Sequence, residues 1–354
     1  MSRVVVVGAG AWGTALAIQA ARAGNGVMLW ARDPARAAVL AETRENPRLP
    51  GVKLPDAVEV TATLTPSALE GEGSDGGASH REAGLDPPPQ LSPSRREGEG
   101  IPGAVLLAVP LQHLRGVLVR LPQNTPPLVV CAKGVETGTN LLPLEVAAEL
   151  HSAAPAVVLT GPNFAHEIAA GLPAASVVAC TDALLRAEII ALLATPAFRL
   201  YGNDDPVGAQ VGGAAKNVIA IAAGAVIGAG LGENARAALI TRGLAELSRL
   251  AVALGGRSDT VSGLSGLGDL LLTCTGASSR NYSLGLALGR GERLAAVLGA
   301  RDSVTEGVAT APALLARAAG VDLPICAAVA ALVQGRTTLR AAIDALLARP
   351  RRDE

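Results

Sequence analysis

A few charged side chains stand where this sequence gives them no reason to face solvent. Lys133 ends the apolar stretch LVVCAK, and Lys216 follows Gly-Gly-Ala-Ala in an otherwise apolar segment. Asp269 lies in the glycine-rich stretch GLSGLGD. Lysine and aspartate are rarely buried unless they are paired, and unusual surroundings of this kind are typical of functional sites. These residues are therefore candidates for chemistry, with two structural alternatives: Lys216 as a solvated residue at a helix start, and Asp269 as a cap of the helix LLLTC.

The tripeptide Ser279-Arg280-Asn281 is suited to a phosphate group. The planar guanidinium of an arginine can bind more than one phosphate oxygen, and the neighbouring hydroxyl and amide can bind others. The alternative is that Arg280 is an ordinary surface charge. Together with the lysines, the tripeptide favours a small phosphorylated ligand.

A glycine-rich turn near the start of the chain predicts a dinucleotide site. The β-branched run 4–7 reads as a buried strand, the turn 8–13 fits GxGxxG, and a helical pattern follows. Gly8 permits the tight turn, Gly10 lets a pyrophosphate approach, and Gly13 lets the helix pack on the strand. The helix N-terminus then offers N–H groups to the phosphates. The expected cofactor contacts in the turn are Gly8, Gly10, Ala11, Trp12 and Gly13.

The end of the second strand bears on the choice between NAD and NADP. An acidic residue there binds the ribose hydroxyls of NAD, whereas an arginine accommodates the extra phosphate of NADP. This chain has Arg32 followed by Asp33, so we expect NADP to be accepted, with NAD not excluded. The structural alternative is that Asp33 caps the next helix, with Pro34 at its first position.

Segments of strand and helix alternate along the first part of the chain. Strands are expected at residues 4–7, 27–33, 57–63, 104–110, 128–134, 156–162, 175–180 and 198–201. Helices are expected at 14–24, from 112, from 140 and at 164–170. Such alternation is typical of a doubly wound, mostly parallel sheet. We therefore predict a Rossmann-like α/β domain over residues 1–205.

The pattern changes after residue 205, where no further strand is expected. Helices are predicted at 210–230, 235–254, 282–288, 311–319 and 338–347. Residues 206–354 are therefore expected to form an all-α domain.

Residues 71–100 differ in composition from the rest of the chain. They are rich in Gly, Pro, Ser and charged residues and contain almost no apolar residues to bury. We interpret them as a disordered insertion between a helix that starts at 66–70 and the amino end of a strand. Ligands of open α/β sheets bind beyond the carboxyl ends of the strands, so the insertion should be dispensable for activity.

The composition excludes some classes of function. A formal net charge of −1 over 354 residues gives no field to attract nucleic acid or acidic lipid. The longest apolar stretch, 218–231, is broken by glycine and too short for a bilayer, so we expect a core helix and no membrane span. The first strand begins too early to leave room for a signal peptide, which favours a cytoplasmic protein.

The cysteines and histidines show no spacing typical of a metal site. The four cysteines lie far apart without a CxxC pair, and the four histidines form no HExxH motif. We expect buried thiols and no bound metal.

Read in order, the sequence carries the motifs GAGAWGTALA, CAKG, GPNFAHE, GGAAKNVIAI, ENARAALITRGLAE, GLGDLLLTCT, SRN and TEG. In these motifs the chain closely resembles bacterial NAD(P)-dependent glycerol-3-phosphate dehydrogenases, everywhere except residues 70–100. The resemblance implies reduction of dihydroxyacetone phosphate by NAD(P)H to sn-glycerol 3-phosphate, a precursor of phospholipids. By analogy, the alanine-rich helical domain suggests a homodimer.

The resemblance also implies roles for single residues. Lys216 matches the general acid/base lysine of the family, and Lys133 matches a lysine that touches both substrate and cofactor. The implied substrate contacts are Lys133, Gly161, Asn163, Lys216, Asp269, Ser279, Arg280 and Asn281. The implied cofactor contacts beyond the glycine turn are Arg32, Lys133, Ala165, Arg280, Val304 and Glu306. Asn163 departs from the family, which usually has a hydroxyl residue there, so an amide hydrogen bond to the substrate is expected.

The implied chemistry agrees with the residues. Hydride addition to a ketone leaves an alkoxide, to which protonated Lys216 can give a proton while Asp269 holds the ammonium.

The alternatives are a dehydrogenase acting on a β-hydroxy acid or ketopantoate, and a non-catalytic NAD(P) sensor. The phosphate-like tripeptide disfavours the first, and the presence of both Lys216 and Asp269 disfavours the second. A short-chain dehydrogenase is disfavoured because neither Tyr201 nor Tyr282 has a lysine four residues on.

Overall fold

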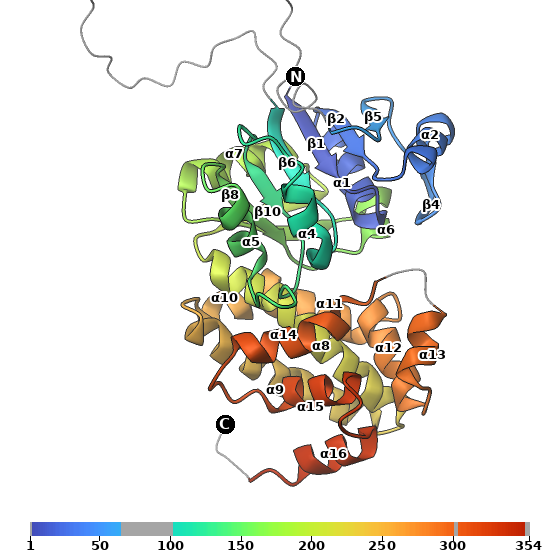
Figure 1. The fold of residues 1–354 in the computed structure, drawn as a ribbon, viewed down its shortest axis with the longest axis vertical. Coiled ribbons are helices and arrows are strands. Elements are labelled where there is room, and N and C mark those ends of the chain that lie inside the picture. The colour runs from blue at the N-terminus through green and yellow to red at the C-terminus, as the bar shows by residue number, and fades with distance from the viewer. Residues whose placement is uncertain (1, 65–101, 301–303, 351–354) are drawn as a thin grey trace, which may run out of the picture.

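The computed structural model describes residues 2–64, 102–300 and 304–350, in an α/β part and a helical part (Figure 1). The α/β part is built on an eight-stranded sheet in the order β10-β9-β8-β7-β6-β1-β2-β5. Its strands are β1 (Arg3–Val7), β2 (Gly26–Trp30), β5 (Val58–Thr61), β6 (Pro102–Leu107), β7 (Leu128–Val130), β8 (Ala156–Thr160), β9 (Ala174–Ala179) and β10 (Phe198–Asn203). All neighbouring strands pair in parallel except β8 and β9. The predicted mostly parallel sheet is confirmed.

Helices cover both faces of this sheet, as in a doubly wound fold. Val4 and Val6 of β1 pack in a core with α1 (Ala11–Arg22), α6 (Ala165–Ala170) and α7 (Ala183–Leu193). The alternate residues Val5 and Val7 pack on the other face with α4 (Leu111–Leu118) and α5 (Pro143–Leu150). Because successive side chains of a strand point to opposite faces, the four consecutive valines of β1 serve both cores. The other elements among the described residues of this part are α2 (Pro34–Thr43) and a hairpin of β3 (Glu45–Asn46) and β4 (Leu49–Lys53).

The helical part follows directly after the sheet and contains no strand among the residues described from 204 to 350. Its elements are α8 (Pro206–Gly228), α9 (Gly232–Ala253), α10 (Ser258–Ser262), the π-helical turn η1 (Leu264–Gly268), α11 (Asp269–Thr275), α12 (Arg280–Gly289), α13 (Leu294–Gly299), α14 (Glu306–Arg317), α15 (Pro324–Val333) and α16 (Leu339–Leu347). The predicted all-helical character is confirmed. β10 ends and α8 begins close to the expected boundary at residue 205, which itself stays a prediction.

Helix α8 is the centre of the helical part. It has 23 residues and contains an 18-residue window with a mean hydropathy of 1.6, so it is long and apolar enough to cross a bilayer, but 89% of that window is buried in the protein. It is therefore a core helix, as expected. Glycines let α12 pack against its backbone: a Cβ on Gly224 would lie 2.0 Å from the carbonyl oxygen of Tyr282, and one on Gly285 would lie 1.9 Å from that of Ile221.

Several expected elements differ from the structure. The strand expected at 128–134 ends at Val130, and the helix expected from Asn140 begins at Pro143, because residues 131–142 leave the sheet as a loop. Asn140 has a left-handed φ of 59°, which no helix continues through. The hairpin β3–β4 and helices α7, α10, α13 and α15 were not anticipated. The predicted insertion 71–100 and the helix start at 66–70 lie outside the described residues.

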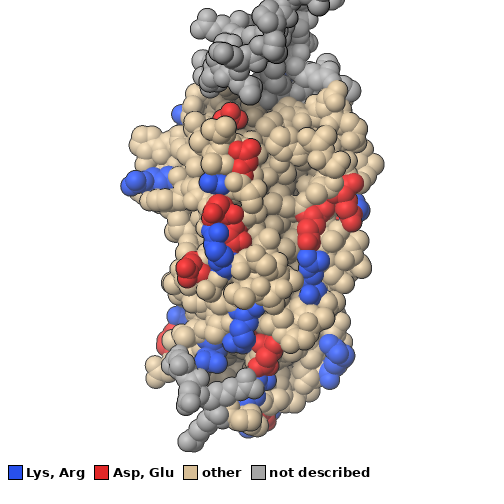
Figure 2. Space-filling model, turned by 90° about the vertical axis from the view of Figure 1, so that its left-hand side faces the viewer, with Lys and Arg blue, Asp and Glu red and all other residues tan. Residues whose placement is uncertain are grey.

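The buried thiols are confirmed, and the surface in view carries charges of both signs. On the face shown in Figure 2, basic and acidic side chains are interspersed over a largely uncharged surface, which suits a formal net charge of −1. The cysteines are free and buried, at Cys131, Cys180, Cys274 and Cys326.

Candidate active site

The structure brings Lys133, Lys216 and Asp269 together between the two parts of the chain. Lys133 Nζ donates to Asp269 Oδ2 at 2.7 Å and to the Gly161 carbonyl oxygen at 3.2 Å. Lys216 Nζ donates to the other carboxylate oxygen, Oδ1. Asp269 is fully buried and Lys216 is 8% exposed. A buried carboxylate is thus shared by two ammonium groups, one from each part of the chain.

Both structural alternatives for these residues are excluded. Lys216 lies inside buried α8 rather than at a solvated helix start. Asp269 is the first residue of α11, where Gly268 is the N-cap and no side chain caps the helix. Its carboxylate is used for the lysines instead.

The small residues before Lys216 explain how the cluster is assembled. A Cβ on Gly212 would lie 2.5 Å from the Ser265 carbonyl oxygen, so only glycine lets η1 pack against α8. A Cβ on Gly213 would lie 3.1 Å from Thr160 Oγ1 and 3.5 Å from Cγ of Lys133. Gly212 therefore lets η1, which leads into Asp269, pack against α8, and Gly213 leaves room for the Lys133 side chain beside Lys216.

Burial makes the Lys216 amine a much weaker base than usual. Desolvation is the largest cause and lowers its pKa to about 8, with the charge of Lys133 acting in the same direction and that of Asp269 opposing it. An amine with this pKa can both give up and regain a proton near neutral pH.

The glycine turn has the geometry that a dinucleotide requires. Gly8 has a φ of 114°, and a Cβ on Gly13 would lie 1.8 Å from the Gly8 carbonyl oxygen, so both positions need glycine. A Cβ on Gly10 would meet no atom within 4 Å. Gly10 is the N-cap of α1, which has no side-chain cap and no acidic residue in its first turn. The helix N-terminus and the open side of Gly10 thus fit a pyrophosphate.

The residues after β2 have different roles. Asp33 caps α2, since its Oδ1 accepts from the backbone N–H groups of Ala35 and Arg36 at 3.0 and 3.3 Å; this confirms the structural alternative. Arg32 is exposed at the carboxyl end of β2. Arg36, which the sequence did not single out, donates through Nη2 to the Ala9 carbonyl oxygen at 2.9 Å and so anchors the glycine turn.

A second polar cluster joins α8, α12 and α14. Asn281 Nδ2 donates to Asn217 Oδ1 at 2.9 Å, and Asn281 Oδ1 accepts from the Gly307 backbone N–H at 3.0 Å. Asn217 Nδ2 in turn lies 3.5 Å from Glu306 Oε2. Asn217 is a residue that sequence reasoning missed; the signal was a buried amide directly after Lys216 in an apolar helix.

Glu306 connects this cluster to the lysines electrostatically. Burial raises its pKa, and the positive charges of Arg280, Lys216 and Lys133 counteract that shift. Arg280 is an exposed side chain at the start of α12, and Ser279 is the N-cap of that helix, with its Oγ accepting from the Tyr282 backbone N–H at 3.2 Å. The positive charges of Arg280 and of the two lysines therefore all act on the carboxylate of Glu306.

The remaining predicted contacts lie at the start of α6 and before α14. Asn163 Oδ1 accepts from Ser176 Oγ at 2.8 Å, whereas its Nδ2 is buried without a hydrogen-bond partner among the described residues. Ala165 is the first residue of α6 and is partly buried. Val304 is 45% exposed, two residues before Glu306.

Comparison with known protein families gives a consistent result over both parts of the chain. The N-terminal model of NAD-dependent glycerol-3-phosphate dehydrogenase matches residues 3–72 and 99–185, and the C-terminal model matches residues 205–344. The unmatched residues 73–98 lie within the insertion that the composition marks.

Individual relatives agree with the family models. The glycerol-3-phosphate dehydrogenase, NAD(P)+, of Acidiphilium cryptum is 55% identical over 99% of this chain and 97% of its own length, and that of Gluconobacter oxydans is 47% identical over 98% and 97%. A crystal structure of the Coxiella burnetii glycerol-3-phosphate dehydrogenase is 33% identical and superposes with a TM-score of 0.84 over 98% of this chain and 99% of that one. A ketopantoate reductase of Ralstonia eutropha shares the fold alone. It is 18% identical and superposes with a TM-score of 0.53 over 98% of this chain and 99% of that one. The chain is thus an oxidoreductase that uses NAD or NADP, and it belongs to the NAD-dependent glycerol-3-phosphate dehydrogenase family.

Proposed function

We propose that this chain reduces dihydroxyacetone phosphate to sn-glycerol 3-phosphate with Lys216 as the proton donor. The observation that carries the proposal is the buried cluster in which Lys216 and Lys133 share Asp269. A ketone that accepts a hydride becomes an alkoxide, and a protonated amine in hydrogen-bond reach completes the alcohol. The positive charge of the same amine stabilises the oxygen while its negative charge develops.

The chain's own groups account for the proton in both directions. The nicotinamide cofactor supplies the hydride when it is bound. Lys216 Nζ gives its proton to the carbonyl oxygen of the substrate, becomes a neutral amine, and regains a proton from solvent. Asp269 fixes the direction of Nζ, and the lowered pKa of Lys216 keeps both of its states accessible. In the reverse reaction the neutral amine takes the proton of the alcohol.

The other predicted contacts supply orientation in this proposal. Arg280, with Ser279 and Asn281 beside it, would bind the substrate phosphate, and fixing that group holds the carbonyl for attack. Lys133, Gly161 and Asn163 would contact the substrate from the carboxyl edge of the sheet. The proposed cofactor contacts are the glycine turn with Arg32, Lys133, Ala165, Arg280, Val304 and Glu306.

The test compares substrates that differ in one group. NADPH absorbance is followed at neutral pH with dihydroxyacetone phosphate, unphosphorylated dihydroxyacetone and ketopantoate in parallel. Oxidation with the phosphorylated ketone only is the expected result and supports the phosphate role of Ser279 to Asn281. Turnover of ketopantoate alone would show that ketopantoate, and not dihydroxyacetone phosphate, is the substrate. No turnover of any of the three ketones despite tight NADPH binding would favour a non-catalytic NAD(P) sensor.

The same proposal has three further parts: the chain supplies glycerol 3-phosphate for phospholipids, it is located in the cytoplasm, and it forms a homodimer. They are supported by the family resemblance and, for the location, by the burial of α8. Sedimentation of the purified chain at micromolar concentration measures the oligomeric state.

A further inference from the structure

The position of Lys133 is not set by a regular element. Lys133 lies in the loop 131–142, after β7 has ended, yet its Nζ must reach Asp269 on α11 and the Gly161 carbonyl oxygen. The residue after it, Gly134, has a φ of 129°, and a Cβ there would lie 2.8 Å from Thr310 Oγ1. A loop with this geometry needs other groups to hold it.

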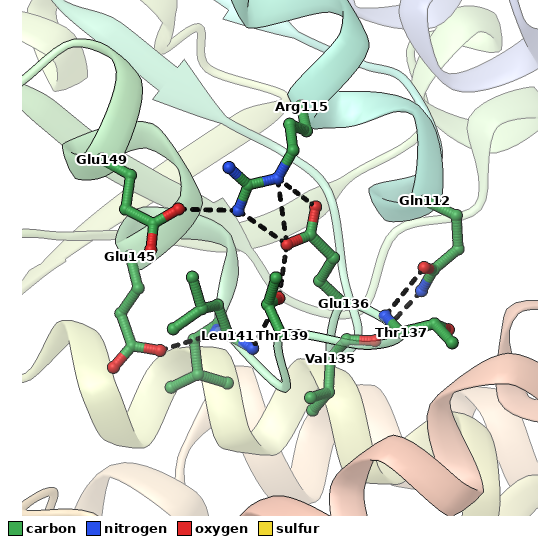
Figure 3. A network of polar contacts seen from close by, with 10 residues as sticks. Gln112, Arg115, Val135, Glu136, Thr137, Thr139, Leu141, Glu145 and Glu149 are labelled. Carbon is green, nitrogen blue, oxygen red and sulfur yellow. Dashed lines mark hydrogen bonds and ion pairs between the residues drawn. The ribbon is translucent and has the colours of Figure 1, made fainter.

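Helix α4 provides those groups (Figure 3). Gln112 Nε2 donates to the Val135 carbonyl oxygen at 3.0 Å, and Gln112 Oε1 accepts from the Thr137 backbone N–H at 3.0 Å. One side chain thus satisfies the backbone on both sides of Glu136. An amide that uses its donor and acceptor on one segment fixes both its position and its direction.

Glu136 forms the second attachment between α4 and this loop. Its carboxylate is bound by Arg115, whose Nε donates at 3.0 Å to Oε1 and whose Nη2 donates at 2.8 Å to Oε2, and by the Thr139 hydroxyl (Figure 3). The bond to Arg115 is the main cause that lowers the pKa of Glu136, so the carboxylate stays charged. Glu136 is 7% exposed, and its backbone N–H and C=O close the loop on Leu141 and Asn140.

We propose that Gln112 and Glu136 are positioning residues that hold the loop on α4 so that Lys133 shares Asp269 with Lys216. The proposal rests on the proposed function, in which that pair works on the substrate. The side chain of Gln112 bonds the backbone at residues 135 and 137, and that of Glu136 bonds Arg115 and Thr139, so both act by holding the loop. Without them, Lys133 would lose its fixed distance from Asp269.

The consequence for Lys216 follows from the charges around it. The titratable groups that act on it electrostatically are Asp269 and Cys274 of α11, Glu306 of α14, and Lys133 of the loop. Of these, only Lys133 depends on the contacts of Gln112 and Glu136. When Lys133 withdraws, Lys216 loses a neighbouring positive charge, and its pKa rises.

The experiment uses Gln112→Ala and Glu136→Gln, each in the full chain. The matched control is Glu149→Gln, which removes only the outer ion pair of Arg115, from a side chain that is 51% exposed. We expect kcat for dihydroxyacetone phosphate to fall by ~10- to 100-fold in both test variants, as for a displaced catalytic group, with Tm close to wild type. The control should stay within about twofold of wild type, because an exposed ion pair contributes little.

A second readout does not depend on turnover. Lysine occurs only at positions 53, 133 and 216, so carbon-13 labelling of lysine gives NMR signals that Lys53→Arg and Lys133→Arg assign. The Lys216 signal should titrate near its pKa of about 8 in the wild type and at higher pH in both test variants. The proposal is overturned if the Lys216 titration and kcat are both unchanged in the test variants. It is also overturned if the test variants differ from wild type only in a lower Tm. If the wild type does not reduce the ketone, the proposed function fails while the titration still tests the positioning.

Discussion

Among single residues, the three glycines of the turn show how one residue type serves two different purposes. Gly8 and Gly13 are required by the protein itself, because a side chain at either would press on backbone: Ala108 for Gly8, and Gly8 for Gly13. Gly10 is not required by the fold, since a Cβ there would meet no atom within 4 Å. Its lack of a side chain matters only when a pyrophosphate approaches.

This difference predicts opposite outcomes for two substitutions. Gly10→Ala should raise the Kd for NADPH about tenfold or more, which is ~1.4 kcal/mol, and leave Tm nearly unchanged. Gly13→Ala should lower the free energy of unfolding by ~1–3 kcal/mol, because its Cβ would overlap the Gly8 carbonyl oxygen. Thermal unfolding and NADPH titration of both variants check this. Equal NADPH affinity in Gly10→Ala and wild type would contradict the proposed place of the pyrophosphate.

The catalytic candidates could be predicted from the sequence because they are charges in apolar or small surroundings. Lys133, Lys216 and Asp269 stood out for that reason, and they meet in one cluster. Residues that act through hydrogen bonds gave no such signal. Gln112 and Arg36 look like ordinary helix residues until tertiary structure brings them to a loop backbone.

At the scale of secondary-structure elements, the packing of α8 against α12 places residues of both polar clusters. Lys216 and Asn217 lie on α8, and Asn281 lies on α12, where it bonds Asn217. The close approach of the two helices depends on Gly224 and Gly285, each facing a carbonyl oxygen of the other helix. A helix crossing this tight leaves no space for a methyl group.

Gly285→Ala should therefore destabilise the chain by about 1–3 kcal/mol, since its Cβ would lie 1.9 Å from the Ile221 carbonyl oxygen. Gly116→Ala is the matched control: Gly116 lies within α4, and a Cβ there would meet nothing within 4 Å. That substitution should stabilise by ~0.5–1 kcal/mol through helix propensity. Urea unfolding measures both. Equal stability of Gly285→Ala and wild type would show that the two helices can separate without cost.

The elements that sequence periodicity predicted well are the long, apolar ones. The strands of the sheet and helices α8 and α9 have strong patterns, and only their ends differ from expectation. The hairpin β3–β4 was missed because it is short, polar and interrupted by prolines. The loop 131–142 was assigned partly to a strand and partly to a helix, since its side-chain bonds to α4 come from residues far away in the sequence.

At the scale of the whole molecule, the site lies where the two parts meet. The α/β part contributes Lys133 and the glycine turn, which follow the carboxyl ends of β7 and β1, and the helical part contributes Lys216, Asp269 and Glu306. In the sequence, residues 71–100 precede β6, which begins at Pro102, whereas the site lies at the carboxyl ends of the strands. Neither part alone contains the proposed proton donor together with the glycine turn, so the proposed activity requires both.

Proton transfer by Lys216 is the central claim, and one measurement tests it most directly. The rate of NADPH oxidation by dihydroxyacetone phosphate is measured for the wild type, Lys216→Ala and Lys216→Met, where Met keeps most of the side-chain volume. NADPH binding, followed by fluorescence, shows that each variant is folded. In the wild type, kcat for reduction should fall as pH rises through the Lys216 pKa of about 8, because the neutral amine has no proton to give.

Both variants should bind NADPH with wild-type affinity and lose at least about a hundredfold in kcat, without the fall near pH 8. Turnover within a few-fold of wild type in either variant, or a fall in kcat near pH 8 that persists without Lys216, would contradict the assignment of Lys216 as the proton donor.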